Sequence, residues 1–383
     1  MHCFKLSLFV LFNYKRGLSM KLIKKSLLSA AIAISVGTSG IAVATDMVIV
    51  SWGGAYTKSQ QLAYHDPYMK LNPGIKIIND DSASEGASKI RAQAEAGNTT
   101  WDVVDVVPST AIALCDEGLL VEINPDKDLA MAPDGTPASV DFGDALISPC
   151  FIPQIVYSTT IGYRTDKLST APKTIADVFD TKKFPGKRAL QKNPAGNLEW
   201  ALIADGVDKT KVYDVLGTKA GVDRAFKKLD TIKDSVIWWT KGAQPGQLLA
   251  DGEVVMASAY NGRLFAAIEE NNQPIGMMWD HQVFELDGWV IPVDAPNKAE
   301  AMKYVKFATD TQRLADQAKY ISYGPARKSS AAMVGKHATL GIEMGPHMPT
   351  APANAKNIIL KNVAWWADHK DELSERFEAW LAI

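Results

Sequence analysis

The segment between Met20 and Tyr56 constrains the fold most, because an export signal leads directly into an apolar strand and an aromatic loop. Three lysines precede an apolar stretch over residues 27–43, and Ala42-Val43-Ala44 is a small-x-small cleavage site. Residues 47–50 then read as a buried strand, followed by a loop with two aromatic side chains around a glycine pair. We predict a signal peptide over residues 1–44, cleaved near Ala44 and starting at Met1 or Met20, and a mature chain in the periplasm.

Charge and length limit what the mature chain can be. Removing the six basic side chains of residues 1–44 from the total of 41 leaves 35 against 43 acidic ones, a formal charge of −8. Nucleic acids and anionic membranes both require a basic face, so neither is expected as a partner. No stop-transfer charges follow the apolar stretch, which argues against a membrane anchor. The remaining 339 residues exceed a single core and predict two domains.

Two cysteines, Cys115 and Cys150, remain after removal of the signal peptide. In an oxidising compartment, two cysteines of one exported domain are most simply a disulfide. A catalytic thiol would require a base and an orienting group, and neither cysteine stands in a nucleophile signature. The sequence therefore favours a disulfide, and a cysteine-dependent enzyme is the alternative.

Strand-like and helix-like segments alternate, which predicts an α/β fold with a largely parallel sheet. Residues 101–107 read as a central strand, followed by a loop at 108–110 and a helix at 112–117. Two further strands, at 154–163 and 287–292, are expected to cross between lobes. We predict one lobe from residues 45–156 plus 293–330 and a second from 157–292 plus 331–383. The ligand would lie between these discontinuous lobes, and an amphipathic helix at 364–381 would cap one of them.

Sequence signatures of catalysis and metal binding are missing from the chain. It contains no G-x-S-x-G, H-E-x-x-H, Walker loop or G-x-G-x-x-G motif, and no two histidines stand at metal-ligand spacing. We therefore expect a binding protein without catalytic residues, metal or cofactor.

Several loop residues are suited to recognising a small amine. Aromatic faces attract cations, carboxylates pair with ammonium groups, and an arginine fork holds a carboxylate. The residues at strand ends with these side chains are Trp52, Tyr56, Ser109, Tyr260, Arg263, Glu285, Asp287 and Tyr323. From its position before a glycine-rich turn, we also expect one ring of Trp238-Trp239, taken as Trp239, to face the ligand.

Five motifs in order resemble a known family over essentially the whole mature chain. They are the Trp52…Tyr56 loop, Trp101-Asp102-Val103-Val104…Pro108-Ser109-Thr110, Ala259-Tyr260-Asn261-Gly262, Leu286-Asp287…Ile291-Pro292, and Tyr323-Gly324-Pro325. The chain is similar to the substrate-binding proteins of polyamine-type ABC importers, the spermidine/putrescine-binding family. This resemblance implies a type II-like, two-lobed α/β fold that closes about a hinge, a monomer that docks on a permease with its ATPase, and no catalysis.

The family's ligand-site positions carry over only in part. By resemblance, Trp52, Tyr56, Ser109 and Tyr323 match lining positions and Asp287 matches the carboxylate that binds an amino group. Tyr260 replaces a frequent tryptophan. A second acidic cluster expected near residues 190–198 is missing, and Asn193 stands at about that place.

Among the differences from the family's pattern of ligand-site residues, Arg263 matters most for the choice of ligand. If it faces the ligand, it would hold a carboxylate while Asp287 holds an amine, which selects an ω-amino acid such as 4-aminobutyrate. If it pairs with Glu285 or Glu253 instead, a diamine such as putrescine, or spermidine, fits better. Alternation places Glu285 and Asp287 on one strand face.

A receptor that serves chemotaxis rather than transport is a further alternative.

Overall fold

The computed structural model describes residues 45–382. The predicted signal peptide, its cleavage site and the choice of initiator therefore lie outside the described residues. β1 begins at Thr45, immediately after the predicted cut. In the described part of the chain, no helix combines the length and apolar character that crossing a membrane requires.

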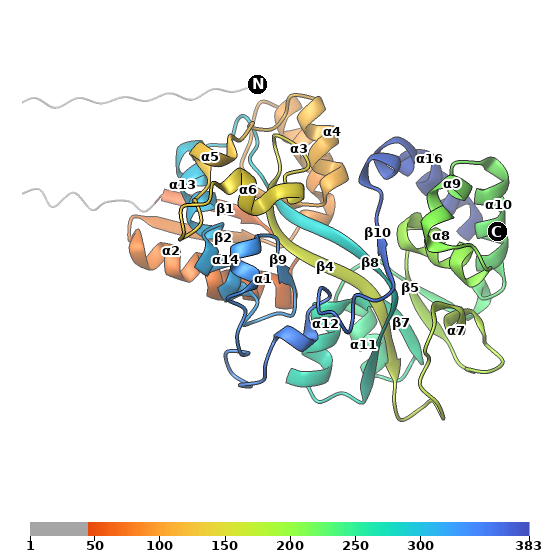
Figure 1. Cartoon of the computed structure of the whole chain (residues 1–383). Helices are drawn as coiled ribbons and strands as arrows, with labels where there is room; N and C mark the ends of the chain where they lie inside the picture. The colour runs from red at the N-terminus through yellow and green to blue at the C-terminus, as the bar shows by residue number, and fades with distance from the viewer. Residues whose placement is uncertain (1–44, 383) are drawn as a thin grey trace, which may run out of the picture. The chain divides into compact units, whose positions relative to one another are not determined.

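A ten-stranded mixed sheet organises the chain, in the order β2-β1-β3-β8-β4-β7-β5-β6 with β9 beside β4 and β10 beside β8 (Figure 1). The strands are β1 (Thr45–Val50), β2 (Ile75–Asp80), β3 (Val103–Val106), β4 (Ile152–Arg164), β5 (Arg188–Gln191), β6 (Val236–Trp239), β7 (Met256–Tyr260), β8 (Ile275–Val290), β9 (Gly324–Pro325) and β10 (Ile358–Leu360). The α/β class is confirmed, but the expectation of a largely parallel sheet is wrong at its centre, where β4 runs antiparallel to β7, β8 and β9.

The two central strands connect the two ends of the sheet. β4 and β8 pair along nearly their whole length, from Ile152 opposite Trp289 to Arg164 opposite Ile275. β3 pairs with the C-terminal part of β8, and β7 pairs with the C-terminal part of β4. The predicted strand at 154–163 is confirmed as β4, whereas the strand predicted at 287–292 overlaps only the end of β8, which begins at Ile275 and ends at Val290.

Helices cover each end of the sheet and bury separate apolar cores (Figure 1). Those at the β2-β1-β3 end are α1 (Gly54–Gln60), the π-helical η1 (Gln61–His65), α2 (Asp66–Leu71), α3 (Gly86–Glu95), α4 (Pro108–Asp116), α5 (Pro125–Asp128), α6 (Ala138–Phe142), α13 (Lys298–Ala308), α14 (Thr311–Gln317) and α15 (Lys328–Ala331). Those at the β7-β5-β6 end are α7 (Ile175–Phe179), α8 (Pro194–Ala204), α9 (Val212–Leu216), α10 (Lys219–Asp230), α11 (Gln244–Ala250), α12 (Asn261–Phe265) and α16 (Val363–Leu381). The predicted C-terminal helix is α16, and its apolar residues pack with those of α8, α9 and α10.

The segment after β3 differs from the predicted loop. α4 begins at Pro108 rather than at Ile112, so residues 108–110 form its first turn. Proline suits this position, because the first amide groups of a helix have no intrahelical acceptor. Ser109 is therefore a helical residue.

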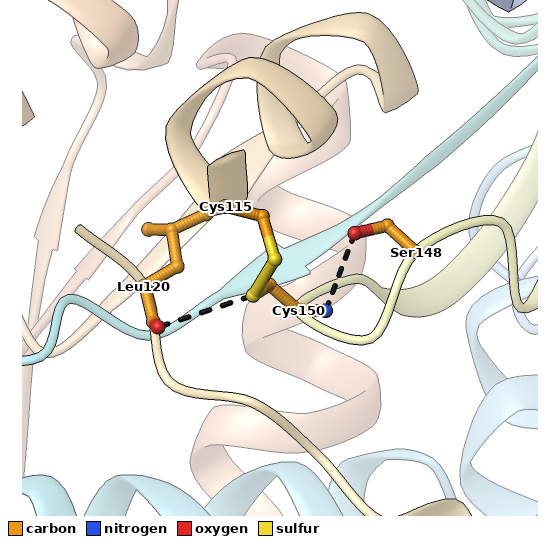
Figure 2. The surroundings of a disulfide bond; sticks show 4 residues. All are labelled: Cys115, Leu120, Ser148 and Cys150. Atoms are coloured by element: carbon orange, nitrogen blue, oxygen red, sulfur yellow. Dashed lines mark hydrogen bonds between the residues drawn. A yellow bond between two sulfur atoms is a disulfide. The ribbon is translucent and has the colours of Figure 1, made fainter. Parts of the chain in front are cut away.

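The two remaining cysteines form the predicted disulfide (Figure 2). It joins Cys115 in α4 to Cys150, just before β4, with the Cα atoms 5.8 Å apart. A disulfide leaves no thiolate to act as a nucleophile. The alternative of an enzyme that uses Cys115 or Cys150 is therefore wrong for this structure.

Removal of this disulfide tests its contribution to stability. It closes a sequence separation of 35 residues, and the chain-entropy relation then gives about 3–4 kcal/mol. We expect the Cys115→Ala/Cys150→Ala variant to lose roughly that free energy of unfolding in urea titrations. Thiol titration of unreduced mature protein should detect no free thiol, and a stoichiometric thiol would contradict the assignment.

Candidate functional site

Aromatic side chains from four separate segments meet beside the central strands. We call Trp52, Tyr56, Tyr157, Tyr260 and Tyr323 the aromatic cluster. Tyr157 contacts Tyr260 edge to face at 5.4 Å between ring centroids, and Tyr323 lies 6.1 Å from Tyr157 and 5.8 Å from Tyr56. Trp52, Tyr56, Tyr260 and Tyr323 were predicted from sequence, and the fold brings all four together. Aromatic faces in this arrangement can surround a methylene chain or a cation.

One buried asparagine fixes three of the segments that carry this cluster. Asn261, the first residue of α12, accepts a hydrogen bond from the Ser158 amide at 3.0 Å and donates one to the Ser322 carbonyl at 2.6 Å. The next residue must be small, since a Cβ at Gly262 would come within 2.6 Å of the Tyr323 ring. The Tyr-Asn-Gly sequence thus positions Tyr260 and Tyr323 relative to β4.

Arg263 contacts the loop that follows β1. Its Nη2 donates to the carbonyl oxygens of Trp52 at 3.2 Å and Gly53 at 3.1 Å, while its buried Nε has no hydrogen-bond partner in the part of the chain that the structure describes. The loop can turn here because Gly53 and Gly54 adopt positive φ values of 74° and 61°. The guanidinium therefore connects α12 with the loop carrying Trp52, at the edge of the cluster.

Asp287 lies on β8 opposite Ile155, whose side chain belongs to the same apolar group as the cluster. Its side chain is 4% exposed, and among residues 45–382 its carboxylate accepts a hydrogen bond from the Gly288 amide alone, at 2.8 Å. Burial raises its pKa well above the usual range, and the nearby Asp105 raises it further. The Trp52 indole favours the charged form of Asp287, although its Nε1 does not reach hydrogen-bond geometry.

Asp105 is a second buried carboxyl, and it sits in a hydrogen-bonded network. Gln60 Nε2 donates to Asp105 Oδ2 at 2.8 Å, and Gln60 Oε1 accepts from the Ser51 hydroxyl at 2.6 Å. Gln154 accepts from both Gln60 and the Tyr56 hydroxyl. Burial raises the pKa of Asp105 to about 8 despite these bonds, so the group is largely neutral near pH 7.

Glu285 is paired with a cation that the sequence did not indicate. Lys361 Nζ lies 2.5 Å from Glu285 Oε1, and the Tyr157 hydroxyl donates to Oε2 at 2.6 Å. In the described part of the chain, no salt bridge joins Arg263 to Glu285 or to Glu253. The interpretation that Arg263 is held by either acid is therefore wrong for this structure. Glu285 and Asp287 share one face of β8, as alternation predicted.

Three other predicted residues are not members of the aromatic cluster. Ser109 is in the first turn of α4, and within residues 45–382 no hydrogen bond links it to the cluster. Asn193 caps α8 by accepting from the Ala195 amide at 3.0 Å. Trp239 is 1% exposed, packs against Tyr260 at 5.7 Å and donates to Ser258, so it supports Tyr260 from behind.

Sequence reasoning missed Tyr157, Asp105 and Lys361. Tyr157 could have been found by alternation along β4, which places it on the face of Ile155. Asp105 had a signal as well, because a carboxylate inside Val103-Val104-Asp105-Val106-Val107 interrupts a buried strand. Lys361 had none, since its place depends on pairing between β10 and β8. No group of three or more His, Cys, Asp or Glu within residues 45–382 is arranged to hold a metal ion.

The raised pKa of Asp105 predicts a pH-dependent stability. Its folded-state pKa of about 8 exceeds its ordinary value, so its contribution is fully present below about pH 4 and is lost as the pH rises toward 8. We expect the unfolding free energy of wild type to fall relative to Asp105→Asn by up to ~1.4 kcal/mol per pH unit in this window. Urea titrations at pH 5, 6 and 7.5 measure the difference, and a pH-independent difference would show that Asp105 titrates normally.

Known proteins resemble this chain in both sequence and structure. The family model described as "Bacterial extracellular solute-binding protein" matches residues 63–350. A gamma-aminobutyric acid-binding protein of Pseudomonas aeruginosa is 37% identical over 336 residues, covering 88% of this chain and 91% of the relative. The solved structure of a GABA receptor is 34% identical with a TM-score of 0.73, covering 88% of this chain and 98% of that one.

The polyamine-binding proteins are more distant. The spermidine/putrescine-binding periplasmic protein of Salmonella typhimurium is 25% identical over 184 residues, covering 45% of this chain and 48% of the relative. The predicted resemblance and the non-enzymatic class are thus confirmed at the level of the family. The chain belongs to the bacterial extracellular solute-binding proteins.

Proposed function

We propose that this chain is the periplasmic receptor of an ABC importer and that its ligand is a zwitterionic ω-amino acid such as 4-aminobutyrate. One observation carries the choice of ligand. Arg263 and Asp287 both border the aromatic cluster, and within residues 45–382 neither forms a salt bridge. A buried charge without a partner is costly. A ligand with one carboxylate and one ammonium would pair both groups at once.

Each end of such a ligand has a suitable partner. The Arg263 guanidinium can bind a carboxylate through the donors that the Trp52 and Gly53 carbonyls leave unused, Nε among them. Asp287 can accept an ammonium group, which would return its carboxyl to the charged form. The aromatic cluster would pack the methylenes between the two ends. The names of two similar proteins, which mention gamma-aminobutyric acid and GABA, support this choice.

Ligand binding is proposed to close two lobes, with boundaries at 45–156 plus 293–330 and at 157–292 plus 331–383. β4 and β8 would serve as the hinge, since each contributes to both ends of the sheet. The bonds from Arg263 to the carbonyls of Trp52 and Gly53 would then bridge the lobes. The closed monomer would dock on a permease with its ATPase. Delivery to a chemotaxis receptor would use the same site.

The ligand class is tested first with a thermal-shift panel on mature protein. Ligand at about 100 times its Kd adds roughly 2.7 kcal/mol of stability. We expect 4-aminobutyrate to raise Tm clearly and putrescine, spermidine and betaine to leave it unchanged. A shift with putrescine and none with 4-aminobutyrate would contradict the proposal.

Ligands that lack one of the two charged groups test Arg263 and Asp287 separately. We expect Arg263→Met to lose the preference for 4-aminobutyrate over butylamine, and Asp287→Asn to lose the preference for 4-aminobutyrate over butyrate. Removing one partner of a buried charge pair costs about 2–5 kcal/mol, so each loss should exceed roughly 30-fold in calorimetric Kd. Arg224→Met, at an exposed arginine of α10 paired with Asp205, is the matched control. If both variants keep the wild-type preference, Arg263 and Asp287 do not bind the charged groups of the ligand.

A further inference from the structure

We propose that Lys361 determines specificity: by pairing with Glu285 it withdraws a carboxylate that a second ligand ammonium would otherwise use. This inference rests on the proposed function. The C-terminal segment carries Lys361 to this place. β10 pairs in parallel with β8 from Gln282 to Phe284, and the Lys361 amide donates to the Phe284 carbonyl at 3.4 Å. Extending this register by one residue sets Lys361 beside Glu285.

The pair is shielded, and both oxygens of the carboxylate are used. The side chains of Lys361 and Glu285 are 13% and 11% exposed. Lys361 occupies Oε1, while Oε2 accepts from Tyr157, whose ring is part of the aromatic cluster. Each oxygen of Glu285 thus already has a partner, and the carboxylate lies next to the Tyr157 ring of the cluster. Desolvated ion pairs of this kind contribute to discrimination between ligands more than exposed pairs do.

The balance of charge around the cluster shows why this pair matters. Asp287 and Glu285 are the acids on this face of β8, and Arg263 and Lys361 are the cations beside them. Asp105 is buried and largely neutral, since burial raises its pKa to about 8. Burial raises the pKa of Asp287 as well, so Asp287 counts as charged only when an ammonium group is bound beside it. With a zwitterionic ligand in place the charges of the set are therefore balanced, which suits a ligand of no net charge. Without Lys361 the site would carry one more negative charge, and a diamine could place its second ammonium at Glu285.

Lys370 is a second lysine whose charge interacts with this pair. Lys370 of α16 is exposed to solvent, yet the protein atoms around it lower its pKa, and the neighbouring Lys361 ammonium lowers it further, with Glu285 acting in the opposite direction. When Lys361 alone is replaced, the Lys370 side chain could move toward Glu285 and pair with it instead. The variant series therefore includes Lys361→Met/Lys370→Met.

The experiment measures Kd for 4-aminobutyrate and for putrescine by calorimetry and compares their ratio. We expect Lys361→Met, alone or with Lys370→Met, to shift the ratio toward putrescine by at least about tenfold. Lys361→Arg should retain the wild-type ratio. Adding Glu285→Gln to Lys361→Met should abolish the gain for putrescine. Lys356→Met, an exposed lysine five residues earlier with the same loss of charge, is the control and should leave the ratio unchanged.

The outcomes separate this inference from the proposed function. A wild-type protein that prefers putrescine would overturn the proposed function, and this inference with it. A wild-type protein that prefers 4-aminobutyrate, with an unchanged ratio in folded Lys361→Met, would overturn only the specificity role and leave the pair as a structural tie between β10 and β8. If Lys361→Met does not fold, Lys361→Gln keeps a donor to Glu285 without the charge and must show the same shift.

Discussion

The antiparallel pairing of β4 with β8 is the interaction on which the rest of the structure depends. β8 also pairs with β3 at one end of the sheet, and β4 also pairs with β7 toward the other end. The two groups of helices are therefore joined through the β4–β8 pair. Register irregularities occur at Pro153/Ile155 and at Thr159/Ile161. Such irregularities bend strands and redirect side chains. The segment between them carries Tyr157, opposite Glu285, and Ile155, opposite Asp287.

Three largely shielded acids near the aromatic cluster are accommodated in three different ways. Asp105 is surrounded by amide and hydroxyl groups and stays largely neutral, because burial raises its pKa to about 8. Glu285 is held by Lys361 and Tyr157. Within the described chain, Asp287 accepts a hydrogen bond from the Gly288 amide alone, and its pKa is raised by burial and by Asp105. Asp287 is thus the acid whose environment improves most when a cation arrives, which is the property expected of a ligand-binding carboxylate.

Local patterns predicted much of the fold, because they depend on a few neighbouring residues. The strand at β4, the helix α16 and the disulfide partners followed from alternation, helical spacing and cysteine count. The start of α4 was placed four residues late, since Pro108-Ser109-Thr110 suits either a turn or a first helical turn. The antiparallel centre of the sheet was missed, because strand direction depends on which strands meet and not on the pattern within one strand.

The residues of the candidate site were likewise predictable from the sequence only in part. The sequence by itself determined the residue types at the strand ends, so Trp52, Tyr56, Tyr260, Arg263, Asp287 and Tyr323 could be named from their chemistry and position. Only the tertiary structure decided which charges are paired. From the sequence, Glu285 was one possible partner for Arg263, but β10 brings Lys361 to Glu285 from 76 residues away in sequence. The energy of a charge depends on its neighbours in space and on its burial, and these are fixed only when distant segments pack together.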